Sequence, residues 1–213
     1  MWEDRIEAGQ KLAKKLTRYR GKHAIVYGLP RGGVVVAAEV ARVLYAPLDV
    51  IIARKIGHPF SPEYAVAAVT ETGELAKNEG EILELGKNWL EGAVAKEMAE
   101  AKRRRELYTG QRKHISAKNR TAIVVDDGIA TGLTLEAAIR QLKKEHPAKI
   151  VIAVSVTPDD VAAEIEAEVD ELVCLHRERS FFGAVGSYYQ RFEQTEDQDV
   201  IDILEELRET EEA

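Results

Sequence analysis

The residues best suited to chemistry in this sequence are two adjacent carboxylates, Asp126 and Asp127, which end an apolar run. A loop rich in glycine and threonine follows them and leads into a segment with helical spacing. The free N–H groups of such a loop, together with the positive end of the helix dipole, favour a phosphate group. Because the carboxylates would repel a phosphate, they are better suited to accept hydrogen bonds from the vicinal hydroxyls of a ribose. A sugar 5-phosphate meets both requirements.

The segment from Val124 to Thr134 resembles the signature with which type I phosphoribosyltransferases bind 5-phosphoribosyl-1-pyrophosphate (PRPP). The resemblance implies that Asp126 and Asp127 hold the ribose 2- and 3-hydroxyls. It also implies a Mg²⁺ ion that the two aspartates support indirectly, through those hydroxyls or water. The 5-phosphate would lie in the loop formed by Gly128, Ile129, Ala130, Thr131, Gly132, Leu133 and Thr134. The alternative is an acidic pair that merely ends a strand and caps a helix.

A second loop, from Tyr27 to Val34, places Arg31 among glycines between an apolar run and a helix. It resembles the pyrophosphate loop of the same family. The resemblance implies that Arg31 pairs with pyrophosphate oxygens, that Gly32 and Gly33 donate backbone N–H groups, and that a cis peptide bond precedes Arg31. An ordinary glycine-rich turn is the alternative interpretation.

Two further cations, Arg54 and Lys55, follow the apolar run 48–53, whose carboxyl end is expected to face the ligand crevice. We assign both to pyrophosphate binding. Lys55 and Arg31 are the candidate catalytic residues, because a fixed cation stabilises the charge that leaves with pyrophosphate. Solvated cations in a turn explain Arg54 and Lys55 equally well.

Phe181 and Phe182 follow the last apolar run, and the resemblance implies that they stack on or enclose the acceptor base, as residues at this place often do in the family. Packing of the C-terminal segment on the core is an equal alternative. Ala130 stands where enzymes acting on hypoxanthine and guanine usually carry an aspartate, which disfavours a 6-oxopurine. Residues 126–132, the arginine-rich segment that ends at Tyr108 and residues 181–189 most closely resemble a group of predicted phosphoribosyltransferases of unsettled acceptor. This resemblance implies transfer of the phosphoribosyl group to a nitrogenous acceptor, such as a nucleobase, with release of pyrophosphate.

A second hypothesis is a regulatory protein of the same fold that senses PRPP or a nucleotide without catalysis. Its effector surface would be the arginine run Arg103, Arg104 and Arg105. In the enzyme, one of these arginines and Tyr108 would cover the pyrophosphate if the segment closes as a lid. A solvated helix face is the alternative for most of them.

The elements that must position these residues alternate between expected strands and expected helices. Apolar runs at 24–27, 48–53, 65–69, 121–125, 150–154 and 171–175 alternate with helical segments at 34–44, 133–145 and 158–168, the last with Pro158 in its first turn. This pattern predicts a doubly wound, mostly parallel sheet. A polar insertion at 73–118, with no clear strand and a helical stretch at 81–108, is the candidate lid. Residues 176–213 form a C-terminal hood that ends in an acidic helix at 196–213.

Composition limits the remaining possibilities. The 213 residues are expected to form one phosphoribosyltransferase domain, and the net charge of −7 argues against a nucleic-acid partner. The single cysteine, Cys174, excludes an internal disulfide, and we interpret it as a core residue. The sequence shows no bilayer-spanning run and no signal peptide, so we expect a cytoplasmic protein. Family resemblance implies a homodimer.

Overall fold

The computed structural model describes residues 1–181 and 183–212. Its parallel sheet is built from short apolar runs of the sequence. Gly28 pairs with Val125, so two neighbouring strands end side by side. The five strands, in the order β2-β1-β6-β7-β8, are β1 (Ala24–Gly28), β2 (Leu48–Val50), β6 (Thr121–Asp126), β7 (Lys149–Pro158) and β8 (Glu171–Glu178). All neighbouring pairs are parallel, which confirms the expected α/β sheet.

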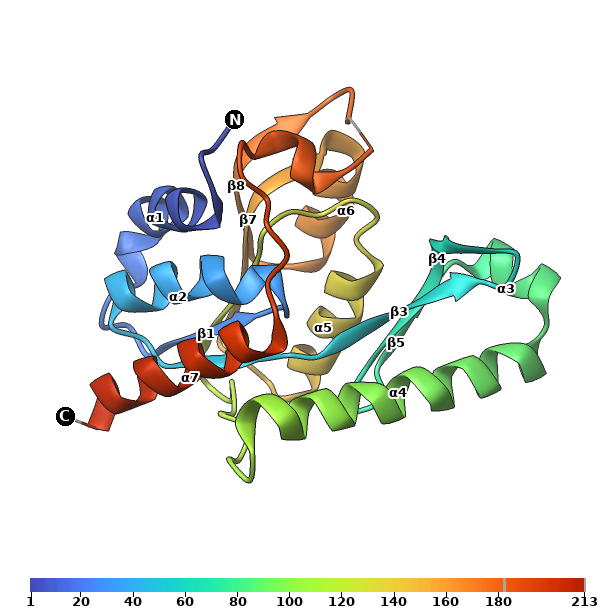
Figure 1. Ribbon diagram of the computed structural model, residues 1–213, viewed down its shortest axis with the longest axis horizontal. Helices are drawn as coiled ribbons and strands as arrows, with labels where there is room; N and C mark the ends of the chain where they lie inside the picture. The colour runs from blue at the N-terminus through green and yellow to red at the C-terminus, as the bar shows by residue number, and fades with distance from the viewer. Residues whose placement is uncertain (182, 213) are drawn as a thin grey trace.

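Helices cover both faces of this sheet (Figure 1). Side chains that alternate along each strand reach opposite cores, so one apolar run supplies both. Val26 and Val125 pack with α1 (Arg5–Leu16) and α2 (Gly32–Leu44) on one face. Tyr27 and Val124 pack with α5 (Leu133–Lys144) and α6 (Asp159–Glu168) on the other. Pro158 ends β7 directly before α6, so its expected place inside the helix was wrong by one residue.

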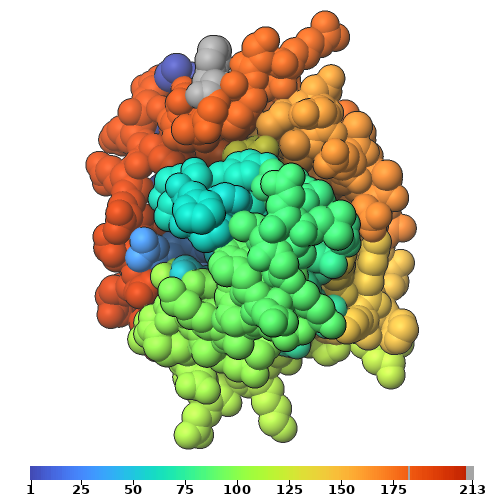
Figure 2. Space-filling model, turned by 90° about the vertical axis from the view of Figure 1, so that its right-hand side faces the viewer, coloured from blue at the N-terminus to red at the C-terminus, as the bar shows by residue number. Residues whose placement is uncertain are grey.

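A second sheet, which the sequence did not predict, is antiparallel and has the order β3-β4-β5. Its strands are β3 (Ala53–His58), β4 (Ser61–Thr70) and β5 (Leu75–Lys77), and they are followed by α3 (Glu79–Leu85) and α4 (Lys87–Thr109). Figure 1 shows this lobe projecting to the right of the parallel sheet. Figure 2, seen from that side, shows the lobe in cyan and green covering much of the near face of the molecule.

Four expectations fail in this lobe. The run 48–53 is not one strand: β2 ends at Val50, and the N–H of Ile52 donates to the carboxylate of Glu71 at 2.9 Å, where the chain passes into the second sheet. The run 65–69 lies in an antiparallel strand, and β5 occupies part of a segment expected to lack strands. The long helical stretch is divided at Gly86, whose φ of 86° no helix allows.

The C-terminal region passes through a 3₁₀ turn, η2 (Val185–Tyr188), to α7 (Asp197–Glu212); another such turn, η1 (Thr17–Tyr19), follows α1. Val200 and Leu204 of α7 pack with Ala101 and Tyr108 of α4, so the expected tail helix docks through its apolar stripe. The end of the insertion and the tail are thus joined to each other. Across the described ranges, none of the helices has the length and apolar character that crossing a bilayer requires.

Candidate functional site

The acidic pair lies where β6 ends, at the carboxyl edge of the parallel sheet. Asp126 is the last residue of β6, and its Oδ1 accepts a hydrogen bond of 2.8 Å from the N–H of Asp127. The carbonyl of Asp127 accepts from the hydroxyl of Tyr189 at 2.6 Å and also from the hydroxyl of Ser155. The backbone at the pair is therefore fixed from β7 and from the C-terminal segment.

The glycine loop after β1 lies directly against this pair. A Cβ atom on Gly33 would come within 2.7 Å of Asp126 Oδ1, and a Cβ on Gly32 would collide with Asp127 Oδ2. The peptide bond between Pro30 and Arg31 is cis, as the family resemblance implied. Residues that are far apart in sequence are thus brought together at one edge, and only glycine allows the approach.

Arg5, which the sequence analysis did not single out, reaches the same place from the start of α1. Its Nε lies 2.6 Å from Asp127 Oδ2, and its Nη1 donates to the carbonyl of Glu193 at 2.7 Å. The side chain is only 12% exposed, and its guanidinium lies 3.8 Å from the ring centre of Phe192. No local pattern marks Arg5, because its partner lies 122 residues away in the sequence.

The electrostatics of the pair are unbalanced. Burial raises the pKa of Asp126 well above its ordinary value, and the negative charge of Asp127 raises it further. Burial also raises the pKa of Asp127, although the guanidinium of Arg5 opposes this effect. Adjacent buried carboxylates disfavour double ionisation. The protein compensates this charge only in part, which is typical of positions that bind a ligand.

The expected phosphate loop lies between β6 and α5. Ala130 and Thr131 are exposed, and Gly132 has the left-handed φ of 78° directly before the helix. Ile129 is buried, and its N–H donates to the carbonyl of Val156 at 2.9 Å, which fixes the loop to β7. The helix N-terminus and an exposed loop therefore adjoin the acidic pair, as the phosphate interpretation requires.

Arg31 faces the first turn of α7. Its Nη1 lies 3.6 Å from carboxylate oxygens of Glu196 and Asp197, and its side chain is 29% exposed. The hydroxyl of Tyr108 donates to the same Asp197 at 2.6 Å, and burial together with this carboxylate raises the pKa of Tyr108 to about 12. Tyr108 is itself buried and packs against α7, and its expected role in a closing lid stays a prediction.

The structure places Arg54 and Lys55 on β3 of the second sheet, and not at the end of a strand of the parallel sheet, where they were expected. Arg54 pairs with Glu97 of α4 at 2.9 Å. Lys55 is half exposed and pairs with Glu63 at 2.9 Å. Their strand position was wrong because the run 48–53 divides between two sheets. Their assignment to pyrophosphate stays a prediction.

Of the two phenylalanines expected at the acceptor, the structure describes only Phe181. The ring of Phe181 is stacked at 5.5 Å from that of Tyr188 and packs with Val185, as the packing alternative describes. Phe182 lies outside the described residues. Cys174 is partly buried, and burial raises the pKa of its thiol, which fits the interpretation as a packing residue.

The arginine run does not present one surface. Arg103 and Arg104 both pair with Glu100 of the same helix, at 2.7 and 2.9 Å. Arg105 points inward, and its Nη2 lies 2.9 Å from Asp49. An effector surface made of all three arginines is therefore not present, because Arg105 is used inside the protein.

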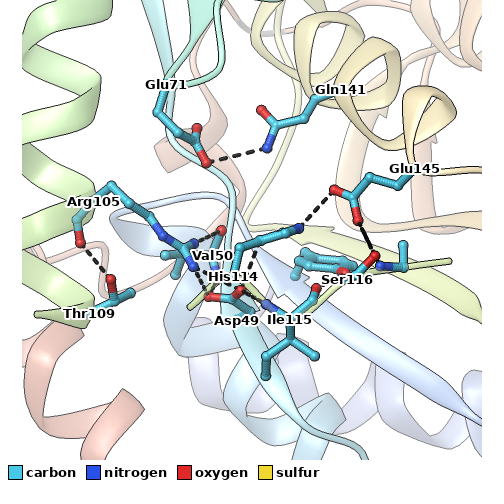
Figure 3. A network of polar contacts seen from close by, with 12 residues as sticks. Asp49, Val50, Glu71, Arg105, Thr109, His114, Ile115, Ser116, Gln141 and Glu145 are labelled. Carbon is cyan, nitrogen blue, oxygen red and sulfur yellow. Dashed lines mark hydrogen bonds and ion pairs between the residues drawn. The ribbon is translucent and has the colours of Figure 1, made fainter. Parts of the chain in front are cut away.

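Asp49 is the centre of a second acidic cluster, shown in Figure 3. Its side chain is 6% exposed and accepts from Arg105 and from the N–H of Ile115, both at 2.9 Å. The Nδ1 of His114 lies 3.0 Å from Asp49 but outside hydrogen-bond alignment, and its Nε2 lies 2.8 Å from Glu145. Burial raises the pKa of Asp49, but His114 and Arg105 outweigh it, so the net shift is downward.

Comparison with known proteins adds independent findings. The model of the phosphoribosyl transferase domain matches residues 2–191. Proteins of two Mycobacterium tuberculosis strains, each named "Putative phosphoribosyl transferase", are 42% identical over 207 residues, which is 96% of this chain and 46% of theirs. This chain therefore spans about half the length of those relatives.

Solved structures show the same fold. The protein in the crystal structure of TT1426 from Thermus thermophilus is 39% identical in sequence to this chain. The two structures superpose with a TM-score of 0.81, over 97% of this chain and 98% of that one. The AQ2163 protein from Aquifex aeolicus is 13% identical, with a TM-score of 0.50 over 84% of this chain and 76% of that one. The second likeness concerns the fold alone.

Proposed function

The chain belongs to the phosphoribosyl transferase family, and from this premise we propose that it binds PRPP with Mg²⁺. It would transfer the phosphoribosyl group to a nitrogenous acceptor and release pyrophosphate. The observation that carries the proposal is the contact between the Gly32–Gly33 loop and the Asp126–Asp127 pair. At this edge, backbone N–H donors lie beside carboxylates that can accept hydrogen bonds from hydroxyl groups. This combination suits a phosphorylated ribose that carries pyrophosphate.

Each part of the site has a role in this proposal. The loop from Gly128 to Thr134 would bind the 5-phosphate, and the aspartates would accept the ribose hydroxyls. Arg31 and the N–H groups of Gly32 and Gly33 would stabilise charge on the departing pyrophosphate. The electrostatic stabilisation of a developing charge is the main catalytic contribution available to such residues.

The residues present fit a metal that is bound mainly by the substrate. Asp126 and Asp127 are oxygen donors, the kind Mg²⁺ prefers. Within residues 1–181 and 183–212, no group of three or more metal-binding side chains is gathered. Mg²⁺ commonly uses one or two carboxylates together with substrate phosphates. When bound, it would neutralise part of the pyrophosphate charge.

The test is release of pyrophosphate from PRPP and Mg²⁺ across a panel of nucleobases and amines. A protein with both substitutions Asp126→Asn and Asp127→Asn should lose turnover and lose the rise in melting temperature that PRPP produces. Glu168→Gln, an exposed carboxylate at the far end of α6, is the matched control and should keep both. Equal stabilisation by ribose 5-phosphate and PRPP would contradict the proposal, since the pyrophosphate would then contribute nothing.

A further inference from the structure

Arg5 is held on several sides at the acidic pair. Its Nε contacts Asp127 Oδ2 at 2.6 Å, its Nη1 donates to the carbonyl of Glu193, and Phe192 covers its guanidinium at 3.8 Å. These partners come from the end of β6 and from the C-terminal segment. A planar guanidinium held at both Nε and Nη1 has a fixed orientation, and so has the carboxylate that accepts from it.

The guanidinium of Arg5 lies beside the glycine loop as well as beside Asp127, so its role extends beyond a salt bridge that anchors the N-terminal segment. A Cβ atom on Gly32 would meet both Asp127 Oδ2 and, at 2.5 Å, Arg5 Nε. Arg5 therefore contacts Asp127 at the side of the carboxylate that faces the proposed pyrophosphate loop. Neither Arg5 nor the N-terminal segment belongs to a sequence motif for PRPP binding identified above.

We propose that Arg5 is a positioning residue for PRPP, which holds the carboxylate of Asp127 in the orientation that the ribose hydroxyls require. This inference rests on the proposed function. Without Arg5, the carboxylate of Asp127, which is 14% exposed, would be free to rotate and would lose its cationic partner. A preset acceptor reduces the ordering that binding requires, so its loss weakens binding of the substrate.

The experiment compares Arg5→Gln and Arg5→Lys with the wild-type chain, and measures the Kd for PRPP with Mg²⁺ and the KM and kcat for pyrophosphate release. Arg5→Gln should raise Kd and KM about tenfold, the value of one charged hydrogen bond, and change kcat about twofold or less. Arg5→Lys keeps the charge but loses the planar fork that reaches both Asp127 and Glu193, so its Kd and KM should lie between those of Arg5→Gln and the wild type.

The matched control is Arg191→Gln. Arg191 also joins the two ends of the chain, through Glu3 and Asp4 at 2.8 and 2.9 Å, but its side chain is 58% exposed and it contacts neither aspartate of the pair. It should leave Kd, KM and kcat unchanged. If Arg5 only anchored the N-terminal segment to the rest of the protein, Arg5→Gln would lower the melting temperature without changing the Kd for PRPP.

The outcomes separate this inference from the proposed function. A wild-type chain that does not bind PRPP contradicts the proposed function. A wild-type chain that binds PRPP, together with an Arg5→Gln variant whose Kd stays within twofold of it, overturns the role of Arg5 alone. Where Arg5→Gln does not fold, Arg5→Lys decides: a Kd equal to that of the wild type overturns the inference.

Discussion

Two groups of enclosed carboxylates in this protein have opposite electrostatic surroundings. Asp49 accepts hydrogen bonds from Arg105 and Ile115, lies beside His114, and has a lowered pKa despite its burial. Asp126 adjoins a second carboxylate, and burial and that neighbour raise its pKa. Asp49 therefore has a guanidinium in hydrogen-bond contact, whereas the charged neighbour of Asp126 is another carboxylate.

The first acid holds elements of the fold together, whereas the surroundings of the second suit the ligand-binding role that we propose for it. Asp49 joins β2 to α4 and to the segment that precedes β6, so its charge is used to hold elements together. The Asp126–Asp127 pair has one cation, Arg5, for two carboxylates. A site whose charge is incompletely compensated can gain free energy when hydroxyls or a cation bind.

The largest expected effect concerns the satisfied cluster. Arg105→Met leaves Asp49 buried without its guanidinium, and breaking a buried pair from one side costs about 3–5 kcal/mol. Urea denaturation would measure this as a loss in the free energy of unfolding. Arg103→Gln, which removes an exposed partner of Glu100, should cost about 0.5 kcal/mol or less. Equal losses for both variants would erase the contrast between the clusters.

The unsatisfied pair should respond in the opposite direction. Asp126→Asn removes a charge that burial disfavours, so without ligand the variant should be more stable than the wild type by about 1 kcal/mol near neutral pH. The raised folded-state pKa means that the protonated form stabilises the protein and that this stability is lost as pH rises through that pKa. Thermal unfolding without PRPP measures the expected gain in stability. Thermal unfolding with PRPP should show that the variant has lost the stabilisation that PRPP gives the wild type.

A pH experiment can sharpen the comparison at His114. Burial lowers the pKa of His114, but Asp49 and Glu145 outweigh it, so the folded-state pKa lies above the ordinary value of 6.5. The groups facing the ring are those two carboxylates and Tyr27, stacked at 5.6 Å. The stability from the raised pKa is fully present below 6.5 and is lost as pH rises through the folded-state pKa.

We therefore expect the free-energy difference between wild type and His114→Gln to be larger at about pH 6 than at about pH 9. Urea denaturation of both proteins at the two pH values measures it. A difference that grows with pH would mean that the ring is neutral in the folded protein, against the description of this cluster as mutually compensated.

The smallest stability effect is expected at an exposed pair. Lys55→Ala removes the contact with Glu63, which should change the free energy of unfolding by about 0.5 kcal/mol or less. Steady-state kinetics then separate the two interpretations of Lys55. A large fall in kcat/KM with unchanged stability would support its assignment to pyrophosphate, and unchanged kinetics would leave it a solvated cation.

The acidic pair and the glycine loop could be found from sequence because each is a local pattern at the end of a strand. The parallel sheet followed from the alternation of apolar runs. The second sheet was missed because the short runs at 53–58 and 65–69 carry no sign of the strand they pair with. Arg5 and Arg105 were missed as partners of aspartates because both contacts join segments more than fifty residues apart.

The C-terminal helix α7 lies beyond residues 2–191, the segment that matches the family model. Yet Asp197, at its first turn, faces both Tyr108 of the insertion and Arg31 of the glycine loop. A protein shortened to the matched segment would keep every motif residue and lose this three-way junction. Domain boundaries drawn from family likeness would therefore remove the helix that Arg31 faces.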